Sequence, residues 1–339
     1  MGNCPRPGNG DAAQHRSIVY EKTSLLTCVH IVKNAQPECT GIVRIVSGLA
    51  KRSASRGYAI SVLFLGEGPL ESVLKEEGIP VSTIPWEGTR NDLAAARRVW
   101  SWLRKHPAKI AHLHHGGLAV RVACRLAGVT AVVQHIHGRI IESDGASVSK
   151  IGFRMVDAVI ANSQAVADCL PGRNAQVVYA GIETGSHPPA LTAPSGPLKL
   201  GVLARLIPLK NVGAVISATA GLASRGIEVH TEIAGSGPSE PSLRDLAARL
   251  GVAERVHFLG WQTDVPRLLA SWDLLVIPSL EEGFGLSALE AMGAARPVVA
   301  SRVGGLCELV VDGVTGNLVP PGDTDALIRC IALLANDRQ

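Results

Sequence analysis

Residues 279–297 read SLEEGFGLSALEAMGAARP, and this stretch decides the fold that the sequence predicts. It follows an apolar run, Leu274 to Ile277, which has the length and composition of a buried strand. A loop with two glycines comes next, and a helix is predicted from about Ser287. A second apolar run, Val298 to Ala300, follows directly. Strand, glycine loop, helix and strand in this order form a unit of a parallel sheet, which binds ligands at the carboxyl ends of its strands.

Two carboxylates flank the loop: Glu282 lies within it, and Glu290 in the predicted first turn of the helix. The backbone N–H groups of Gly285, Leu286 and Ser287 lie between them, and N–H groups at a helix start attract phosphate. A carboxylate can also accept hydrogen bonds from neighbouring sugar hydroxyls. The stretch therefore predicts a site for a phosphorylated, sugar-containing ligand. The alternative is a capping box of Ser287 and Glu290, which needs no ligand, and the stretch alone does not decide between the two.

Length and composition are those of a globular α/β protein. The chain has 339 residues, which is enough for two domains. Its 46% hydrophobic content excludes a disordered chain, and a net charge of +4 does not by itself indicate nucleic-acid binding. The 7 cysteines form no C-x-x-C pair, so neither a disulfide framework nor a cysteine zinc site is indicated. We expect a reducing, cytoplasmic location.

The same alternation of strands and helices recurs along the chain on both sides of a proline-rich segment. Strands are predicted over residues 25–32, 60–65, 81–84, 110–113, 131–134, 158–161, 176–179, 200–204, 229–234 and 256–259, besides the two of the opening stretch. Helices are predicted over 41–56, 70–77, 91–105, 120–126, 212–225 and 242–250.

This rhythm predicts the fold class and its domains. We expect an α/β protein with two Rossmann-like, doubly wound parallel-sheet domains facing each other across a cleft. A flexible tail over 1–24 lacks the apolar core of a secretion signal. The first domain covers 25–182, a linker 183–197, and the second domain 198–339.

Several motifs together resemble the signature of the family-4 retaining glycosyltransferases, which have the GT-B fold. The resemblance rests on Glu282-Gly283-Phe284-Gly285 through Glu290-Ala291-Met292, then Pro297 to Ser301, and Gly304-Gly305 with Glu308. Arg205 and Lys210, five residues apart after a strand, resemble the Arg and Lys that this family places on the donor diphosphate. The likeness is dense in the second half of the chain and looser in the first.

The resemblance implies an activity and a set of site residues. It implies retaining, metal-independent transfer of a sugar from a nucleotide-diphosphate sugar to a hydroxyl acceptor, in the synthesis of cell-envelope polysaccharide, lipopolysaccharide or glycolipid. The donor is a substrate, so no cofactor is expected. The implied catalytic residues are His137, Glu282, Arg205 and Lys210, and the implied donor-binding residues are Gly41, Arg205, Lys210, Gln262, Gly285, Leu286, Ser287 and Glu290.

The sequence departs from the family pattern in four places. Thr40-Gly41 stands where two glycines are usual, and Ala204 and Asn211 replace glycines beside the Arg–Lys pair. Ala295 occupies a position at which a left-handed backbone would cost alanine about 1 kcal/mol, so we expect a different turn there. No segment after Gln339 supplies the family's last helix, which crosses back onto the first domain, so we expect a chain that lacks it.

Histidines cluster at two predicted strand ends. His112, His114 and His115 follow one strand, and His135 and His137 the next. Apart from His137, we interpret them as structural. A metal site is the less favoured reading, because no carboxylate or cysteine is suitably spaced to complete it.

One predicted helix is basic and carries two tryptophans. Residues 91–106 carry four cations beside Trp100 and Trp102, which is compatible with peripheral contact to an anionic membrane at the inner face, although a solvated face with buried tryptophans is favoured.

A dinucleotide oxidoreductase is disfavoured, because no G-x-G-x-x-G run follows a strand. A nucleotide-sugar epimerase of the same fold and a non-catalytic nucleotide-sugar-binding subunit stay open as alternatives.

Overall fold

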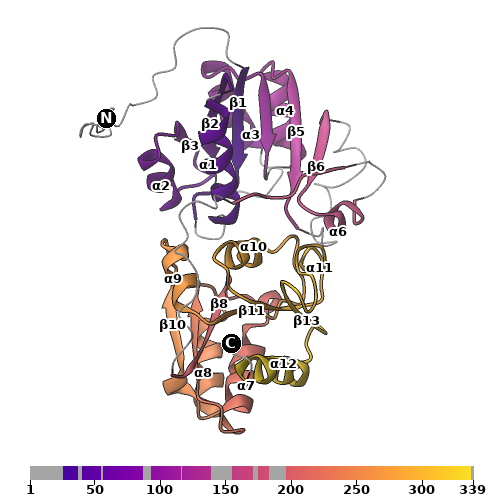
Figure 1. Ribbon diagram of the computed structural model, residues 1–339. Coiled ribbons are helices and arrows are strands. Elements are labelled where there is room, and N and C mark those ends of the chain that lie inside the picture. Colours follow the sequence, from indigo (N-terminus) through magenta and orange to yellow (C-terminus); the bar gives the residue numbers. More distant parts are fainter. Residues whose placement is uncertain are drawn as a thin grey trace, which may run out of the picture.

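The computed structural model describes residues 26–36, 40–54, 56–86, 93–115, 117–138, 155–170, 175–182 and 196–336. Within them the chain forms two α/β domains, drawn one above the other in Figure 1. The predicted fold class is therefore confirmed. The predicted tail over 1–24 and the linker, except for residues 196 and 197, lie outside the described residues.

The first domain is a seven-stranded sheet in the order β3-β2-β1-β4-β5-β6-β7, with every paired neighbour parallel. Its strands are β1 (Leu26–Val32), β2 (Tyr58–Phe64), β3 (Val81–Thr83), β4 (Ile110–Leu113), β5 (Ala131–Ile136), β6 (Ala158–Ala161) and β7 (Gln176–Val177). Its helices are α1 (Thr40–Ala54), α2 (Leu70–Glu76), α3 (Leu93–Lys105), α4 (Leu118–Leu126) and α6 (Gln164–Ala167).

The second domain is a six-stranded parallel sheet in the order β10-β9-β8-β11-β12-β13. Its strands are β8 (Leu198–Leu203), β9 (Val229–Ala234), β10 (Val256–Gly260), β11 (Leu274–Ile277), β12 (Val298–Ser301) and β13 (Gly316–Val319). Its α-helices are α7 (Val212–Ala223), α8 (Glu240–Arg249), α9 (Val265–Ser271), α10 (Leu286–Gly293), α11 (Leu306–Leu309) and α12 (Thr324–Asn336). Two 3₁₀ turns cover Pro208–Lys210 (η3) and Ala253–Arg255 (η4).

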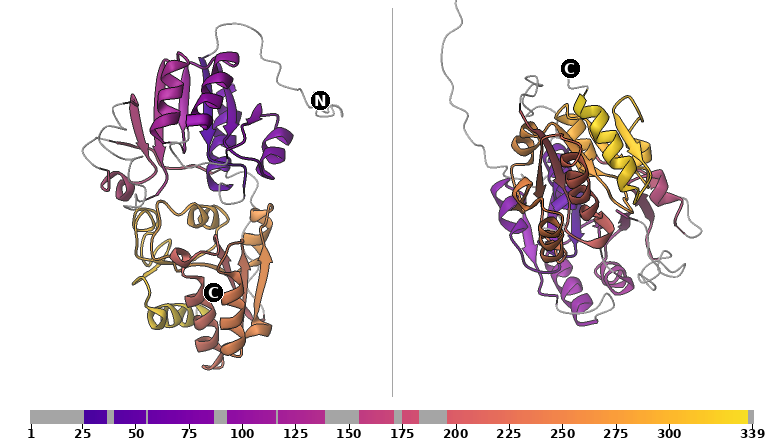
Figure 2. Two further views of the ribbon diagram at one scale, coloured as in Figure 1. Left: turned by 180° about the vertical axis from the view of Figure 1, so that it is seen from behind. Right: turned by 90° about the horizontal axis from the view of Figure 1, so that it is seen from below.

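Both sheets reverse their strand order at one point, between β1 and β4 in the first domain and between β8 and β11 in the second. Loops that follow neighbouring strands diverge at such a point and leave a crevice at the carboxyl ends. Figures 1 and 2 show α10 and α11 at the side of the second domain that faces the first. The fold therefore directs one crevice from each domain toward the other.

The strand side chains explain why the sheets are covered by helices. In β1, Val29 and Ile31 pack on one face in the core with Val99 of α3 and Val120 of α4. Val32 packs on the opposite face in a second core with residues of α1 and α2. Strands buried on both faces give the near-continuous apolar runs seen in the sequence.

The last described helix, α12, stays in the second domain. It packs on α7, where Ile328 lies so close to Gly221 that a Cβ there would touch it at 2.5 Å. None of the described helices combines the length and the apolar character needed to span a membrane.

The turn after α10 corrects one sequence expectation. Ala295 has a φ of 53°, so the chain keeps the left-handed turn and places alanine in it. Asn211 (φ 47°) likewise adopts a conformation that glycine would favour. The expectation of a differently built turn at Ala295 was wrong, because the backbone geometry here is retained without glycine.

Replacing Ala295 with glycine should therefore stabilise the protein. A left-handed backbone costs alanine about 1–2 kcal/mol, and the extra unfolded-state entropy of glycine offsets about 0.4–1 kcal/mol of the gain. We expect a net gain of about 0.5–1 kcal/mol in the free energy of unfolding, measured by urea denaturation. The neighbouring Ala294→Gly, at an ordinary φ of −88°, should destabilise instead. Equal effects of both substitutions would contradict this account.

Candidate functional site

The glycine loop after β11 lies where backbone segments come together closely. A Cβ at Gly283 would overlap the carbonyl oxygen of His137, which belongs to the first domain. A Cβ at Gly304 would overlap the carbonyl of Glu282, and one at Gly305 the carbonyl of Gly283. Glycine is required here because two loops of the second domain and one of the first meet main chain to main chain.

Lys210 and Glu282 are brought together at this loop. The Nζ atom of Lys210, the last residue of η3, lies 2.5 Å from Oε2 of Glu282, and both side chains are largely buried. Ser279, just after β11, donates from Oγ to the same carboxylate oxygen at 3.3 Å. Arg205 is exposed and lies two residues after β8, on the loop that leads to Lys210. The cation and the carboxylate predicted as catalytic thus occupy one site.

The start of α10 excludes the capping box. The N-cap residue is Gly285, with a φ of 98°, and no side chain caps the helix. Leu286 and Ser287 are thus its first residues, so their N–H groups have no acceptor within the helix itself. This arrangement favours the ligand-binding interpretation of the stretch over the structural one.

Glu290 pairs with a residue that the sequence did not suggest. It lies in the second turn of α10, not in the first as predicted, because the helix begins at Leu286. Its Oε1 atom forms an ion pair with Nη1 of Arg44 on α1, across the cleft. In the sequence, Arg44 is only one of several basic residues of a predicted helix. Nothing near it in the sequence indicates that its partner lies 246 residues away.

The start of α1 also meets the second domain. A Cβ at Gly41 would lie 3.4 Å from Leu286 Cδ2, so this glycine faces the start of α10. Trp261 donates from Nε1 to the hydroxyl of Thr40 at 3.3 Å. The next residue, Gln262, donates its side-chain amide to the carbonyl of Leu259 at 2.7 Å. Of the predicted donor-binding residues, Gly41 and Leu286 therefore face each other across the two domains, whereas the side-chain hydrogen bond of Gln262 stays within the second domain.

His137 is held beside the glycine loop by two polar residues after β6. Asn162 donates from Nδ2 to the His137 carbonyl at 2.9 Å, and Ser163 donates from Oγ to the Gly283 carbonyl at 2.6 Å. Burial, and to a smaller extent the neighbouring His135, lowers the pKa of His137 well below its usual value. His137 is therefore neutral at pH 7 and suited to hydrogen bonding rather than to charge stabilisation.

Five imidazoles form a layer next to this site, which we call the histidine layer: His30, His112, His114, His135 and His137. Their rings stack with centroid distances of 4.0 to 5.5 Å. Burial lowers the pKa of His112 to about 4, and burial with the adjacent His112 lowers that of His135 to about 3. Sequence reasoning missed His30, which lies inside an apolar run, and His115 is not part of the layer.

Glu308 joins the two domains at the other side of the cleft. Its carboxylate accepts hydrogen bonds from the backbone N–H groups of Gln164 and Ala165, at 2.8 and 2.7 Å, and from the Tyr179 hydroxyl at 2.9 Å. The hydrogen bond to Glu308 raises the pKa of Tyr179. Glu308, which in the sequence was only part of a motif, thus binds the start of α6.

Replacing Glu308 with alanine should loosen this contact. The N–H groups of Gln164 and Ala165 would lose their acceptor, and loss of about 1 kcal/mol raises local opening roughly fivefold. Hydrogen exchange measured by NMR or mass spectrometry should show faster exchange at these amides. Glu254→Ala, on an exposed turn of the second domain, serves as the control and should leave them unchanged. Unaltered protection in the Glu308 variant would contradict the contact.

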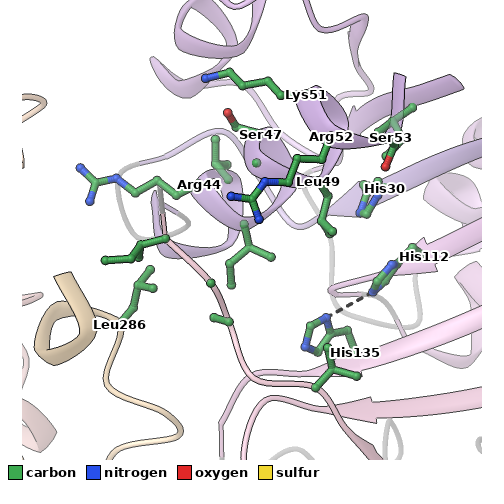
Figure 3. A pocket seen from close by; sticks show the side chains of 18 of the residues that line it. His30, Arg44, Ser47, Leu49, Lys51, Arg52, Ser53, His112, His135 and Leu286 are labelled. Atoms are coloured by element: carbon green, nitrogen blue, oxygen red, sulfur yellow. Dashed lines mark hydrogen bonds between the residues drawn. The ribbon is translucent and has the colours of Figure 1, made fainter. Parts of the chain in front are cut away.

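A cavity of about 750 Å³ lies between the sheet of the first domain and the second domain (Figure 3). Its floor is one face of the sheet, formed by alternate residues of five strands: Cys28, His30, Tyr58, Ile60, Ile110, His112, Val133, His135 and Ile160. Arg44, Lys51 and Arg52 reach it from α1, and Leu286 and Glu290 from α10. The cavity is thus largely apolar, has cations along one side, and extends to the ends of the histidine layer and of α10.

Comparison with known proteins agrees with this geometry. The family model "Glycosyltransferase Family 4" matches residues 40–185, and "Glycosyl transferases group 1" matches residues 197–337. Two parallel-sheet domains with a site between them define a GT-B protein, and the chain belongs to the family-4 glycosyltransferases.

Individual relatives are similar over different lengths. The chain is 24% identical over 338 residues to the Escherichia coli UDP-Gal:alpha-D-GlcNAc-diphosphoundecaprenol alpha-1,3-galactosyltransferase, covering 89% of this chain and 86% of that protein. It is 47% identical over 124 residues to a Mycobacterium marinum D-inositol 3-phosphate glycosyltransferase, covering 36% of this chain and only 27% of that relative. HepE of Anabaena, solved with UDP and glucose, shares the fold with a TM-score of 0.77 and 24% identity, over 91% of this chain and 90% of that one.

Proposed function

We propose that this chain is a retaining glycosyltransferase, which moves a sugar from a nucleotide-diphosphate sugar to a hydroxyl acceptor during synthesis of cell-envelope polysaccharide, lipopolysaccharide or glycolipid. One observation carries the proposal: at the switch point of the second sheet, Lys210 pairs with Glu282 in the loop before α10, and Glu290 lies in the second turn of the same helix. A cation, two carboxylates and exposed helix N–H groups are the groups that a diphosphate linked to two sugars needs.

The residues in the donor half of the site bind different parts of the nucleotide sugar. Arg205 and Lys210 bind the diphosphate, together with the N–H groups of Leu286 and Ser287. Glu290 accepts hydrogen bonds from the ribose hydroxyls and gives up Arg44 when the donor arrives. The backbone near Gln262 borders the base, and Gly41 lets α1 approach the phosphates.

Transfer with retention takes place on one face of the sugar. The bond from C1 to the diphosphate oxygen breaks, the leaving diphosphate takes the acceptor's hydroxyl proton, and the acceptor oxygen bonds to C1 on the side that the diphosphate left. Arg205 and Lys210 stabilise the charge that develops on the diphosphate, which is the largest contribution a preorganised site makes. Glu282 and neutral His137 hydrogen-bond the sugar hydroxyls. Side-chain cations and helix N–H groups, rather than a cofactor or a metal, carry the charge.

The acceptor binds in the cavity of the first domain. Its apolar floor suits an apolar chain. Arg44, Lys51 and Arg52 on α1 suit an anionic group attached to that chain. Such a group would compete with Glu290 for Arg44 and with Glu77 for Lys51. The name of the Escherichia coli relative describes an acceptor of this chemistry, a sugar on a lipid diphosphate. A lipid-linked acceptor is therefore the favoured class.

An acceptor of this kind places the enzyme at the cytoplasmic face of a membrane. Helix α3 carries basic residues, and Trp100 is 40% exposed on it, whereas Trp102 packs against the core. We expect vesicles containing anionic lipid to retain the protein at low salt and to release it at high salt. No retention at low salt would remove the membrane contact from the proposal and leave the transfer reaction untouched.

The test of the function is a transfer assay with a panel of UDP, GDP and ADP sugars and simple or lipid-linked acceptors. We expect one donor class to give a product whose anomeric configuration, read by proton NMR, equals that of the donor. An inverted product would overturn retention. Conversion of the donor sugar without any acceptor would favour an epimerase, and donor binding without turnover would favour a binding subunit.

A further inference from the structure

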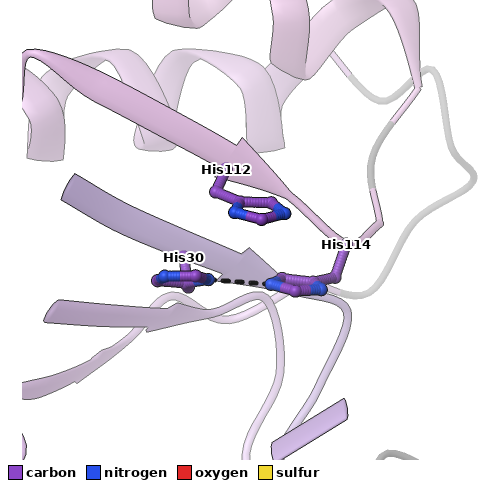
Figure 4. A group of neighbouring side chains, drawn as sticks. All are labelled: His30, His112 and His114. Carbon is purple, nitrogen blue, oxygen red and sulfur yellow. Dashed lines mark hydrogen bonds between the residues drawn. The ribbon is translucent and has the colours of Figure 1, made fainter. Parts of the chain in front are cut away.

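The histidine layer contains a group of three side chains with the composition of a metal site. His30 on β1 is the register partner of His112 on β4, and His114 follows β4 directly. Each of the three offers a ring nitrogen, and these nitrogens lie within 4.8 Å of one another (Figure 4). His30 and His114 are almost fully buried, and His112 is half-buried. The group lies at the switch point of the first sheet, on the face opposite α3 and α4.

Two further histidines surround the three as hydrogen-bond partners. His114 Nδ1 lies 2.8 Å from His137 Nε2, and His112 Nε2 lies 3.2 Å from His135 Nδ1. Histidines that bind a metal usually pair their second ring nitrogen with an acceptor, which fixes the tautomer and the ring orientation. His112 and His114 already have such partners on the side away from His30.

The layer is not satisfied by protein groups alone. His30 Nδ1 and His114 Nε2 face each other at 2.8 Å, so one proton serves both nitrogens. His135 Nε2 is buried and has no hydrogen-bond partner within the described residues. The nitrogens of His30 and His114 thus face each other at a position that an ion could take in place of the shared proton, and the unpaired nitrogen of His135 shows that the described part of the layer is not fully hydrogen-bonded.

We propose that His30, His112 and His114 bind one divalent transition-metal ion of the zinc type, through His30 Nδ1, His114 Nε2 and the His112 nitrogen that its bond to His135 leaves free. Imidazole suits zinc, copper and nickel, whereas magnesium and calcium prefer oxygen ligands. Three histidines leave a fourth position open. The cavity supplies the entry path, because His30 and His112 line it.

Binding requires two movements: the His30 and His114 nitrogens must separate, and the His112 ring, which now stacks on both of these rings, must turn so that its nitrogen points at the ion. Zinc binds imidazole nitrogen at about 2.0–2.1 Å, so two tetrahedral ligands stand about 3.4 Å apart. The His30 and His114 nitrogens, now 2.8 Å apart, must therefore separate by about 0.6 Å. The ion would replace the hydrogen bond between His30 and His114, and the Nδ1–H of His114 would then donate to His137 Nε2. The proposal departs from the sequence interpretation of His112 and His114 as structural.

The first test measures zinc binding to the full chain, produced without a polyhistidine tag and stripped with a chelator. Titration calorimetry with zinc chloride should show one ion per chain. His30→Ala and His112→Ala should each weaken the affinity by at least about tenfold. His257→Ala, outside the histidine layer, should leave the affinity unchanged. Absence of stoichiometric binding, or equal affinity in all three variants, would overturn the proposal.

A second measurement needs no substitution and so does not depend on how the variants fold. X-ray absorption at the zinc edge of the unaltered protein should show three imidazole nitrogens at about 2.0–2.1 Å. A shell of sulfur or of oxygen alone would overturn the assignment. Both tests are made without nucleotide sugar, so their failure leaves the proposed transferase intact, and failure of the transfer assay leaves the metal site intact.

Discussion

Replacing Lys210 with alanine should lower kcat by about 10²- to 10³-fold, the loss seen when one preorganised donor to a developing charge is removed. Lys210 Nζ sits on Glu282 at 2.5 Å in a largely buried site, so the ammonium is already in place before the donor binds. No other lysine of the described residues shares this position at the start of α10. The measurement is steady-state transfer with saturating donor, together with circular dichroism to show that the variant folds.

Two further variants test whether the charge at position 210 is what matters. Lys210→Arg keeps the charge and should retain part of the activity, because guanidinium also binds diphosphate. Lys199→Ala, on an exposed position of β8, removes the same charge elsewhere in the domain and should leave kcat unchanged. Full turnover by Lys210→Ala would remove Lys210 from the chemistry and with it the proposed mechanism.

Replacing Glu290 with alanine should raise the KM for the donor by about 10- to 100-fold, because hydrogen bonds to a charged group contribute about 1.5–3 kcal/mol. The ribose is remote from the reacting carbon, so the loss should fall mainly on KM rather than on kcat. Thermal-shift titration with the nucleoside diphosphate alone should show the same weakening, since it lacks the transferred sugar.

Arg44→Ala provides the matched control for Glu290. It removes the partner of the carboxylate in the unliganded protein but leaves the carboxylate itself available to a ribose. The affinity for the nucleoside diphosphate should therefore stay the same or increase in this variant. A loss equal to that of Glu290→Ala would mean that the ion pair, and not the ribose contact, accounts for the effect.

The fold was predictable because its signals are local. The apolar runs at Leu274–Ile277 and Val298–Ser301 are buried on both faces and read as strands without knowledge of their neighbours. The glycine loop between them was predicted at its correct place from its glycines. The structure gives the reason for one of them: close backbone contacts leave no room for a side chain at Gly283. The ends of the predicted elements shifted by one to a few residues, as at α10, where the cap is a glycine rather than a serine, and α9, β13 and α12 were not predicted.

The contacts across the cleft were not predictable, because they depend on how the domains meet. Arg44 and Glu290, or Glu308 and the start of α6, are paired only by tertiary structure. His30 has no polar neighbour in sequence, and its partners come from β4 and from the segment after it. The two glutamates of the donor half were found from the glycine-loop stretch itself and the lysine from the family resemblance, whereas the pairing of Glu290 with Arg44 needed the structure.

The main-chain packing of Gly283 against His137 has a practical consequence for redesign. Libraries that vary Gly283, Gly304 or Gly305 will consist mostly of inactive members, because a side chain at Gly283 would push the two domains apart and one at Gly304 or Gly305 would displace the glycine loop. Variation is better aimed at the sheet face below α1, where Tyr58, Ile110 and Val133 border open space. An engineer who wants a new acceptor should exchange those three side chains and keep the three glycines as they are.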